Sequence, residues 1–135
     1  MRTRMLLAVA VTVALGSGRA EACLEAHGNH PNPQVQQGLQ TVADALCALD
    51  NQTARFACTI RVGIVGTQLK IEVHRLMVEA VPDAVLAQGA EAYAAWVLQP
   101  GTAGVWVVYY PVRVAGEAPA WRAYLVGPNG KAVQQ

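Results

Sequence analysis

The chain has 135 residues, a formal net charge of +1 and 53% hydrophobic residues. This length suits one domain whose core is large enough to fold without a stabilising metal. The nearly neutral charge balance argues against nucleic acid and anionic lipid as partners, because both attract proteins that carry an excess of basic side chains.

Residues 1–22 have the layout of a secretory signal peptide. Two arginines precede an apolar run at residues 5–15, and the sequence AEA at residues 20–22 has the small-x-small pattern that signal peptidase cuts. The run is shorter than the roughly 20 apolar residues that span a bilayer, so we expect an exported chain without a transmembrane segment.

The mature chain would then begin at Cys23 and carry seven basic and eight acidic side chains. Only two of the basic residues are lysines, and alanine and valine are abundant. This composition favours a bacterial source, and we therefore expect a periplasmic location.

Three cysteines, Cys23, Cys47 and Cys58, would enter an oxidising compartment, where disulfides form. One of them must stay unpaired within the chain, whichever pair forms. We expect Cys47–Cys58, because Cys47 lies near the end of a predicted helix and Cys58 on the next strand, with ten residues between them. Cys23–Cys58 and Cys23–Cys47 are the alternatives. We expect no lipid anchor on Cys23, since charged Glu21 breaks the small apolar tetrapeptide that lipid attachment requires.

A second hypothesis for the N-terminal segment is a metal site. Cys23, His27 and His30 are close enough in sequence to share one ion, and sulfur with imidazole suits Cu(I) or Zn. A fourth ligand would have to come from Glu25 or His74. The alternative is that both segment histidines are ordinary solvated residues.

The apolar pattern predicts a first helix that begins at Pro33. Apolar residues recur at helical intervals from Val35 to Leu49 and form one stripe, and the helix ends at Asp50. Residues 23–33 ahead of it are polar and rich in glycine and proline, so we expect an extended lead-in to an α+β domain at 34–135.

The period then changes to two. Alternating runs at residues 54–66 and 68–74 flank a short turn that contains Gly66, which predicts a hairpin with Ile71 inward and His74 outward.

A second helix is predicted from Pro82-Asp83 to Gln99, since proline and an acid favour a helix start. Three further strands are expected at 104–114, 121–126 and 132–134. The resulting order, α-β-β-α-β-β, predicts an α+β domain with an antiparallel sheet of four or five strands and both helices on one face.

Strict alternation sorts the strand residues into two faces. We expect the helices to cover Phe56, Ile60, Ile71, Trp106, Val108 and Trp121. The predicted open face carries Arg61, Lys70, Glu72, His74, Val105, Val107, Tyr109, Arg113, Arg122, Tyr124 and Val126. Tyrosine, arginine and valine on one surface resemble the composition of protein interfaces, although antiparallel sheets also have ordinary solvated faces.

These observations favour a non-enzymatic module that binds a protein partner, or itself, through the predicted open face. Its expected binding residues are Arg61, His74, Tyr109, Arg113, Arg122 and Tyr124. A metal-binding or trafficking protein that uses the N-terminal cysteine and histidines is the alternative. The chain has no nucleophile-elbow, zinc-protease or phosphate-loop motif, so we assign no catalytic residue, and no cofactor other than the Cu or Zn of the metal hypothesis. A small thiol-dependent or hydrolytic enzyme is a third hypothesis.

Overall fold

The structure is a computed structural model that describes residues 23–52, 57, 59–74, 81–99, 103–110 and 121–135. The predicted signal peptide lies outside the described residues. Within the described part of the chain, neither helix combines the length and the apolar character that crossing a membrane requires.

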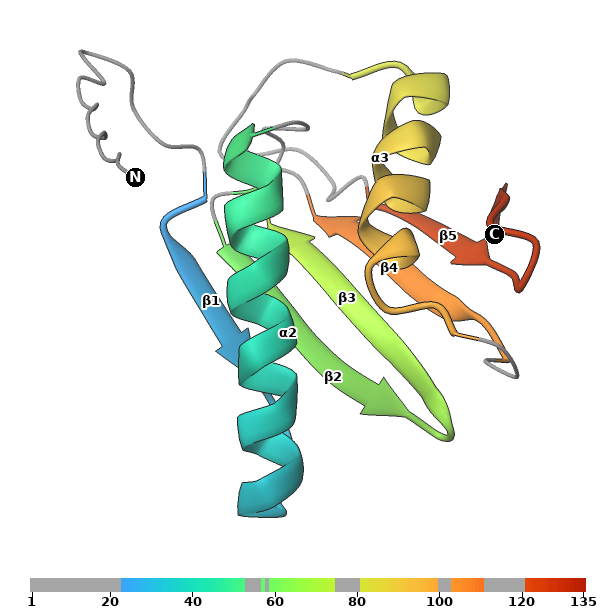
Figure 1. The fold of residues 1–135 in the computed structure, drawn as a ribbon. Coiled ribbons are helices and arrows are strands. Elements are labelled where there is room, and N and C mark those ends of the chain that lie inside the picture. Colours follow the sequence, from blue (N-terminus) through green and yellow to red (C-terminus); the bar gives the residue numbers. More distant parts are fainter. Residues whose placement is uncertain (1–22, 53–56, 58, 75–80, 100–102, 111–120) are drawn as a thin grey trace, which may run out of the picture.

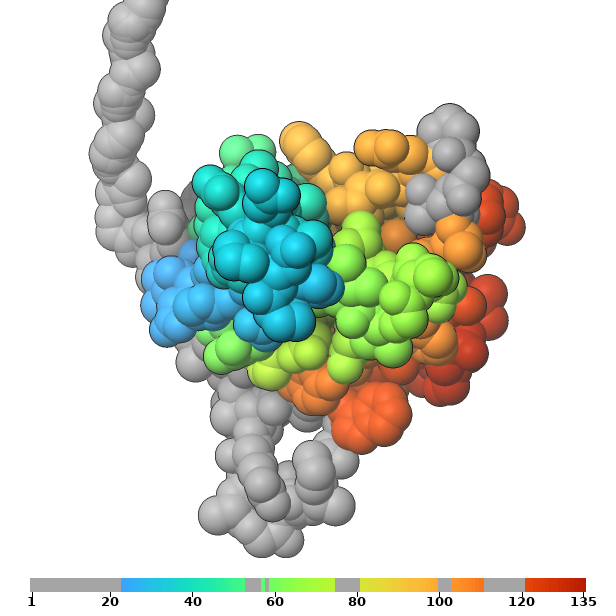
Figure 2. All heavy atoms as spheres, turned by 90° about the horizontal axis from the view of Figure 1, so that it is seen from below, coloured from blue at the N-terminus to red at the C-terminus, as the bar shows by residue number. Residues whose placement is uncertain are grey.

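The described residues form two helices and a sheet of six strands, with the bounds β1 (Glu25–Gly28), α2 (Pro33–Gln52), β2 (Thr59–Val65), β3 (Gln68–His74), α3 (Asp83–Ala95), β4 (Val105–Tyr110), β5 (Arg122–Val126) and β6 (Ala132–Gln134). Strand order in the sheet follows chain order. Figures 1 and 2 show both helices on the same face of the sheet.

The α+β class and the two helices are therefore confirmed, but the predicted antiparallel sheet of four or five strands is wrong. β1 pairs with β2 and β3 pairs with β4 in parallel, while the other neighbours are antiparallel. Each parallel pair is connected through a helix, as parallel neighbours require.

β1 is the strand that the sequence did not predict. Its four residues, EAHG, are not β-branched, and they carry little of the alternation that marks a strand. The strand pairs with β2 from Glu25↔Thr59 to Gly28↔Val62. It also lies close to α2: a Cβ on Gly28 would come within 2.3 Å of the Gln40 backbone nitrogen.

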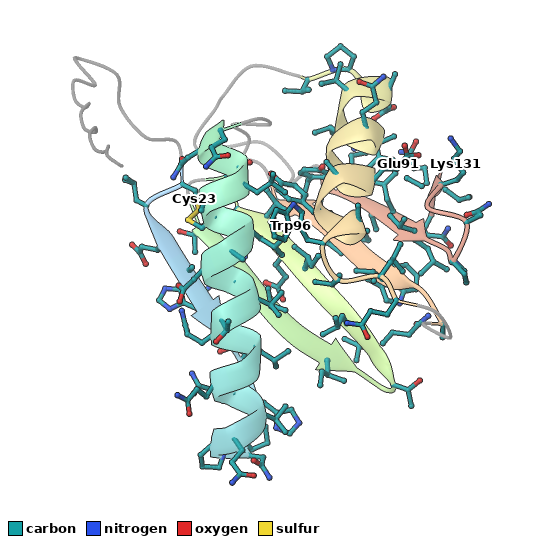
Figure 3. All side chains as sticks on the ribbon, in the orientation of Figure 1. Cys23, Glu91, Trp96 and Lys131 are labelled. Atoms are coloured by element: carbon teal, nitrogen blue, oxygen red, sulfur yellow. A yellow bond between two sulfur atoms is a disulfide. The ribbon has the colours of Figure 1, made fainter. Side chains whose placement is uncertain are left out.

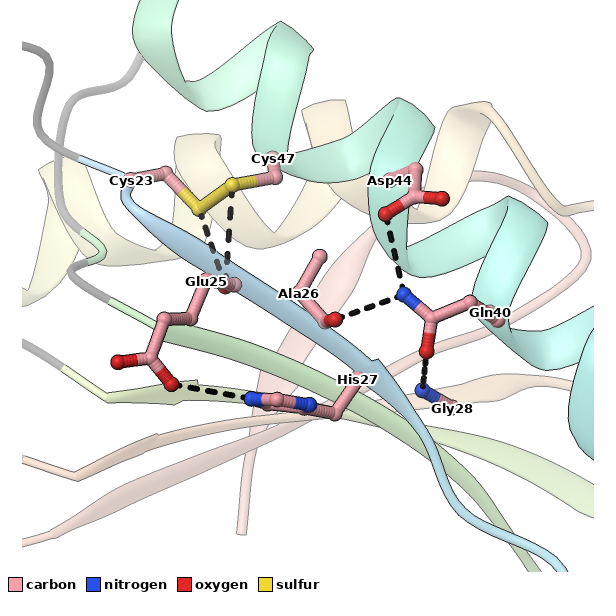
Figure 4. A network of polar contacts seen from close by, with 8 residues as sticks. All are labelled: Cys23, Glu25, Ala26, His27, Gly28, Gln40, Asp44 and Cys47. Atoms are coloured by element: carbon pink, nitrogen blue, oxygen red, sulfur yellow. Dashed lines mark hydrogen bonds and ion pairs between the residues drawn. A yellow bond between two sulfur atoms is a disulfide. The ribbon is translucent and has the colours of Figure 1, made fainter.

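Side-chain amides of α2 bond the backbone of β1 (Figure 4). Gln40 donates from Nε2 to the Ala26 carbonyl at 2.7 Å and accepts at Oε1 from the Gly28 N–H at 2.9 Å. Gln36 donates to the Gly28 carbonyl at 3.2 Å. These amides satisfy backbone groups that an unprotected edge strand would offer to another chain.

A disulfide between Cys23 and Cys47 joins the start of β1 to α2, with 5.4 Å between the two Cα atoms. The predicted Cys47–Cys58 pair is therefore wrong. Because β1 is part of the sheet, the residues just ahead of it lie beside α2. The side-chain amide of Asn51 accepts a hydrogen bond from the Cys23 N–H and donates one to the Cys23 carbonyl, which holds Cys23 next to the helix. Cys58 lies outside the described residues.

The first hairpin is confirmed. β2 and β3 pair from Thr59↔His74 to Val65↔Gln68, and Gly66 in the turn has a φ of +63°, which favours glycine. Ile60, Val62, Ile71 and Val73 are fully buried against the helices, as the alternation predicts.

The helices supply the other side of the core. Helix α2 lies over β1 and β2 and adds Leu39, Ala43 and Leu46 to the core, and α3 lies over β4, β5 and β6 and adds Leu86, Ala90 and Tyr93. Glu91 of α3 also accepts a hydrogen bond at 2.9 Å from the N–H of Ala132, which fixes β6 beneath the helix (Figure 3).

Candidate functional site

The face of the sheet opposite the helices, here called the outer face, is lined by Lys70, Glu72 and His74 of β3, Trp106, Val108 and Tyr110 of β4, and Trp121 and Ala123 at β5. The cross-strand register places these residues together, because Lys70 lies beside Trp106, Glu72 beside Val108 and His74 beside Tyr110. Figure 2 shows the two helical elements gathered on the opposite side.

The prediction for β4 and β5 is therefore wrong, because their two faces are exchanged. Val105, Val107, Tyr109, Tyr124 and Val126, which were expected in the open, are buried under the helices. Trp106 and Trp121, which were expected under the helices, lie on the outer face, and Trp121 is 55% exposed.

The physical reason for the exchange lies in the partners of the aromatic side chains. The Tyr109 hydroxyl donates to the Leu86 carbonyl at 2.8 Å, and the Tyr124 hydroxyl donates to the Asp83 carbonyl at 3.3 Å, so both buried tyrosines end on α3. The Trp106 indole N–H instead donates to Gln68 Oε1 at 2.8 Å on the outer face. Buried polar groups need such partners, and VWVVYY offers no polar residue to mark its outward side.

The six predicted binding residues are not brought together. Arg61 and His74 lie on the outer face, in register with Glu72 and Tyr110 respectively. Tyr109 and Tyr124 are buried. Arg122 lies on the helical side, where its Nε is 3.3 Å from Asp83 Oδ1. Arg113 is outside the described residues.

The outer face contains a cavity of about 530 Å³ that the prediction did not anticipate. Its walls are mostly apolar and include three aromatic rings. The described residues that line it are Val65, Lys70, Trp106, Val108, Tyr110, Trp121, Ala123 and Gln135. Such a volume falls in the usual range for binding pockets, roughly 300–1,000 Å³.

A polar row borders the cavity. Glu72 accepts from Lys70 at 3.5 Å and lies 3.0 Å from His74 Nε2, and the His74 ring stacks on Tyr110 with 4.8 Å between centroids. Burial alone would lower the pKa of Lys70, but bonding to Tyr110 and the charge of Glu72 outweigh it and leave the pKa raised. Lys70 is therefore a cation whose charge is balanced within the face.

The three predicted metal ligands do not form a site. The Cys23 sulfur is consumed in the disulfide, His27 pairs with Glu25 at 3.1 Å, and His30 accepts from the Asn32 N–H at 3.0 Å. A disulfide sulfur is not the thiolate that Cu(I) or Zn binds. Among the described residues, no three potential ligands are grouped closely enough to hold an ion.

A buried acid lies in the helical layer, away from the outer face. Asp50 of α2 is fully buried, and it accepts hydrogen bonds from the Tyr93 hydroxyl of α3 and from the Ala57 N–H at 3.1 Å. Burial, with the neighbouring Asp50 charge, raises the pKa of Tyr93, so the hydroxyl stays a donor. The pair connects the two helices.

No family model, curated protein or solved structure matches this chain.

The cavity left a weak signal in the sequence. Trp106 and Tyr110 are four residues apart in one strand, so alternation puts them on the same face as each other, and the same holds for Trp121 and Ala123 two residues apart. Alternation does not tell which of the two faces they share. That follows from the register of β4 with β3, where Lys70 and Glu72 mark the outward side.

Proposed function

We propose that this chain is an exported, periplasmic, non-enzymatic α+β module that binds a protein partner, or a second copy of itself, through the outer face of its sheet. The binding residues are those around the cavity, above all Trp106, Tyr110 and Trp121. They replace the tyrosines and arginines that the alternation suggested.

The aromatic cavity is the observation that supports this proposal. Protein interfaces are enriched in tryptophan and tyrosine at their centre, where such side chains carry much of the binding energy. Trp121 is 55% exposed and lines this apolar hollow, so an aromatic side chain of the type that anchors interfaces is accessible to a partner.

The disulfide supports export. Cystines persist in secreted and periplasmic proteins and are rare where thiols are kept reduced, and Cys23 directly follows the predicted cleavage motif. A lipid on Cys23 and the Cys23–Cys47 bond exclude each other, because both use the same sulfur.

Mass spectrometry of the protein purified from the periplasm tests the export. We expect an N-terminus at Cys23 and a mass two hydrogens below that of the fully reduced mature chain. A cytoplasmic protein with an intact N-terminal segment would contradict the proposed location.

Site-specific photocross-linking tests the binding surface. A photoreactive phenylalanine analogue replaces Trp121 in one variant and Trp96 in the other. Trp96 caps α3 in the helical layer and is 63% exposed (Figure 3), so it is a matched control. Irradiation of cells that make the protein should give a defined adduct at position 121 and none at position 96. Equal adducts at both positions, or none at 121, would contradict the proposal.

A further inference from the structure

We infer that the partner on the outer face is a different protein whose docking segment carries an acidic side chain near a large apolar one. The apolar side chain fills the cavity, and the acidic side chain meets Arg61 of β2. This inference rests on the proposed function and names the chemistry of its partner.

The outer face is divided into a charged half and an apolar half. Arg61 and Glu72 lie side by side on β2 and β3. Val108 and Ala123 continue the same row across β4 and β5, where the aromatic cavity lies. A segment that covers both halves therefore needs a charged group and an apolar group at a set distance from each other.

The charged half carries a cation in excess. Each carboxylate oxygen of Glu72 already has a contact within β3, one to Lys70 at 3.5 Å and one to His74 at 3.0 Å. In the described part of the chain, the partly buried Arg61 guanidinium forms no ion pair of its own. Its N–H groups therefore favour a partner that supplies a carboxylate.

The other acid among the described residues of this face does not compensate Arg61. Glu25 lies on the edge strand β1 in register with Thr59, and its carboxylate is 3.1 Å from His27. The β1 residue in register with Arg61 is His27 itself. The excess positive charge thus stays on β2, next to the cavity-bearing half.

Gly63 leaves a notch beside this cation. Arg61 and Gly63 share one face of β2, because they are two positions apart, and Gly63 pairs with Lys70 across the hairpin. Among the described residues, a Cβ on Gly63 would meet nothing closer than the Asn29 carbonyl oxygen at 3.7 Å. A carboxylate can therefore approach Arg61 where β2 has no side chain of its own.

The distance from the notch to the cavity sets the spacing within the docking segment. Gly63, Lys70 and Trp106 form one row on three adjacent strands, and strands lie about 4.8 Å apart, so the notch is about 10 Å from Trp106. Val65, which also lines the cavity, is two positions from Gly63, or about 7 Å along β2. An extended segment covers this range when its acid is two or three residues from the apolar side chain.

Charge reversal in the photocross-linking experiment tests the acid. The variant with the photoreactive residue at position 121 receives Arg61→Glu in one strain and Lys131→Glu in another. Lys131 is an exposed cation just before β6, at the other end of the sheet from β2 (Figure 3), so it is a matched control. The adduct at position 121 should fall by about tenfold with Arg61→Glu and stay unchanged with Lys131→Glu.

Gly63→Val tests the notch without changing any charge. The φ of Gly63 is not positive, so valine is compatible with the strand, and circular dichroism of each purified variant confirms the fold. Because the valine side chain fills the space beside Arg61, the adduct should fall several-fold.

Mass spectrometry of the adduct identifies the docking segment. We expect Asp or Glu two or three residues from a large apolar residue in the cross-linked peptide. Replacing that acid in the partner by lysine should restore the adduct in the Arg61→Glu strain, because the two charges are then exchanged.

Three results would overturn the inference and leave the proposed function: an adduct that persists with Arg61→Glu, an adduct that Lys131→Glu reduces equally, or an adduct to a segment without an acid or to a second copy of this chain. A lipid attached to position 121, or no adduct there without any further substitution, would overturn the inference and the proposed function together.

Discussion

Both faces of the sheet carry aromatic side chains, but these side chains have different surroundings on each face. On the helix-covered face, Tyr109 and Tyr124 bury their rings and donate their hydroxyls to α3. On the outer face, Trp106 is held by Gln68 and Trp121 is half exposed beside a cavity. Aromatic side chains therefore complete the core on one face and leave a hollow on the other.

This difference separates stability from binding. Burial of apolar surface under helices stabilises the fold. On the covered face of the strands this surface comes from β-branched residues such as Ile71, and from Tyr109 and Tyr124, whose hydroxyls donate to backbone carbonyls of α3. In the part of the chain that the structure describes, both helices lie on the opposite face from the outer aromatic residues, and Trp121 is 55% exposed. Variants on the two faces should therefore affect different measurements.

The largest effect is expected under the helices. Ile71 is fully buried, and Ile71→Ala should lower the free energy of unfolding by about 2–5 kcal/mol, because it removes apolar contacts and leaves a cavity. Trp121→Ala, measured where the protein is monomeric, should lower it by less than about 1 kcal/mol. Urea unfolding followed by circular dichroism measures both. Equal losses would contradict the distinction between the faces.

The disulfide should have the next largest effect, since it holds α2 and β1 together at the margin of the covered face. Replacing Cys23 and Cys47 by alanine should lower the free energy of unfolding by about 2–4 kcal/mol. Urea unfolding of wild type with and without a reducing agent is the control. If the reduced and oxidised proteins unfold at the same urea concentration, the cystine is absent in solution.

Two glycines test the close approach of β1 to α2. Gly28→Ala places a Cβ against the α2 backbone and should lower the free energy of unfolding by about 1–3 kcal/mol. Gly38, within α2, has open space around it, so Gly38→Ala should instead raise that energy by roughly 0.5–1 kcal/mol. Thermal unfolding of both variants gives the signs. A harmless Gly28→Ala would contradict the position of β1.

High pH tests the buried tyrosine of the helical layer. Burial and Asp50 raise the pKa of Tyr93 above that of an unfolded tyrosine, so the native state keeps a proton that the unfolded state loses above about pH 10. The contribution of the Tyr93 hydroxyl to the free energy of unfolding is therefore present below that pH and is lost as the pH rises above it. Tyr93→Phe should reduce the decline by about 1.4 kcal/mol per pH unit. An unchanged slope would contradict the burial of the hydroxyl.

The sequence predicted those elements whose pattern has only one interpretation. The stripe from Val35 to Leu49 predicts the helix, and the alternation predicts the buried side chains at the centre of β2 and β3, because polar residues such as Arg61, Lys70 and Glu72 mark the outward side. Ile64, at the end of β2, was expected inward and is exposed. Strand β1 was not predicted, because four residues are too few to show a period and because its pairing depends on contacts with α2.

The cavity could not be predicted because β4 has no polar residue to orient it. In VWVVYY either face can be buried by hydrophobicity alone, and the choice follows from β3, whose Lys70 and Glu72 set the outer face for the neighbouring strand. The disulfide depended in turn on β1. Both errors therefore arose from pairings between strands that are distant in sequence.

Oxidative footprinting of a periplasmic extract in a dilution series tests the central claim most directly, namely that the outer face is the surface a second molecule covers. Hydroxyl radicals modify exposed tryptophans, and mass spectrometry reports each position. Trp121 should be protected at high protein concentration and become reactive on dilution, while Trp96 reacts equally throughout. Constant reactivity of Trp121 at all concentrations, or protection of Trp96 instead, would contradict it.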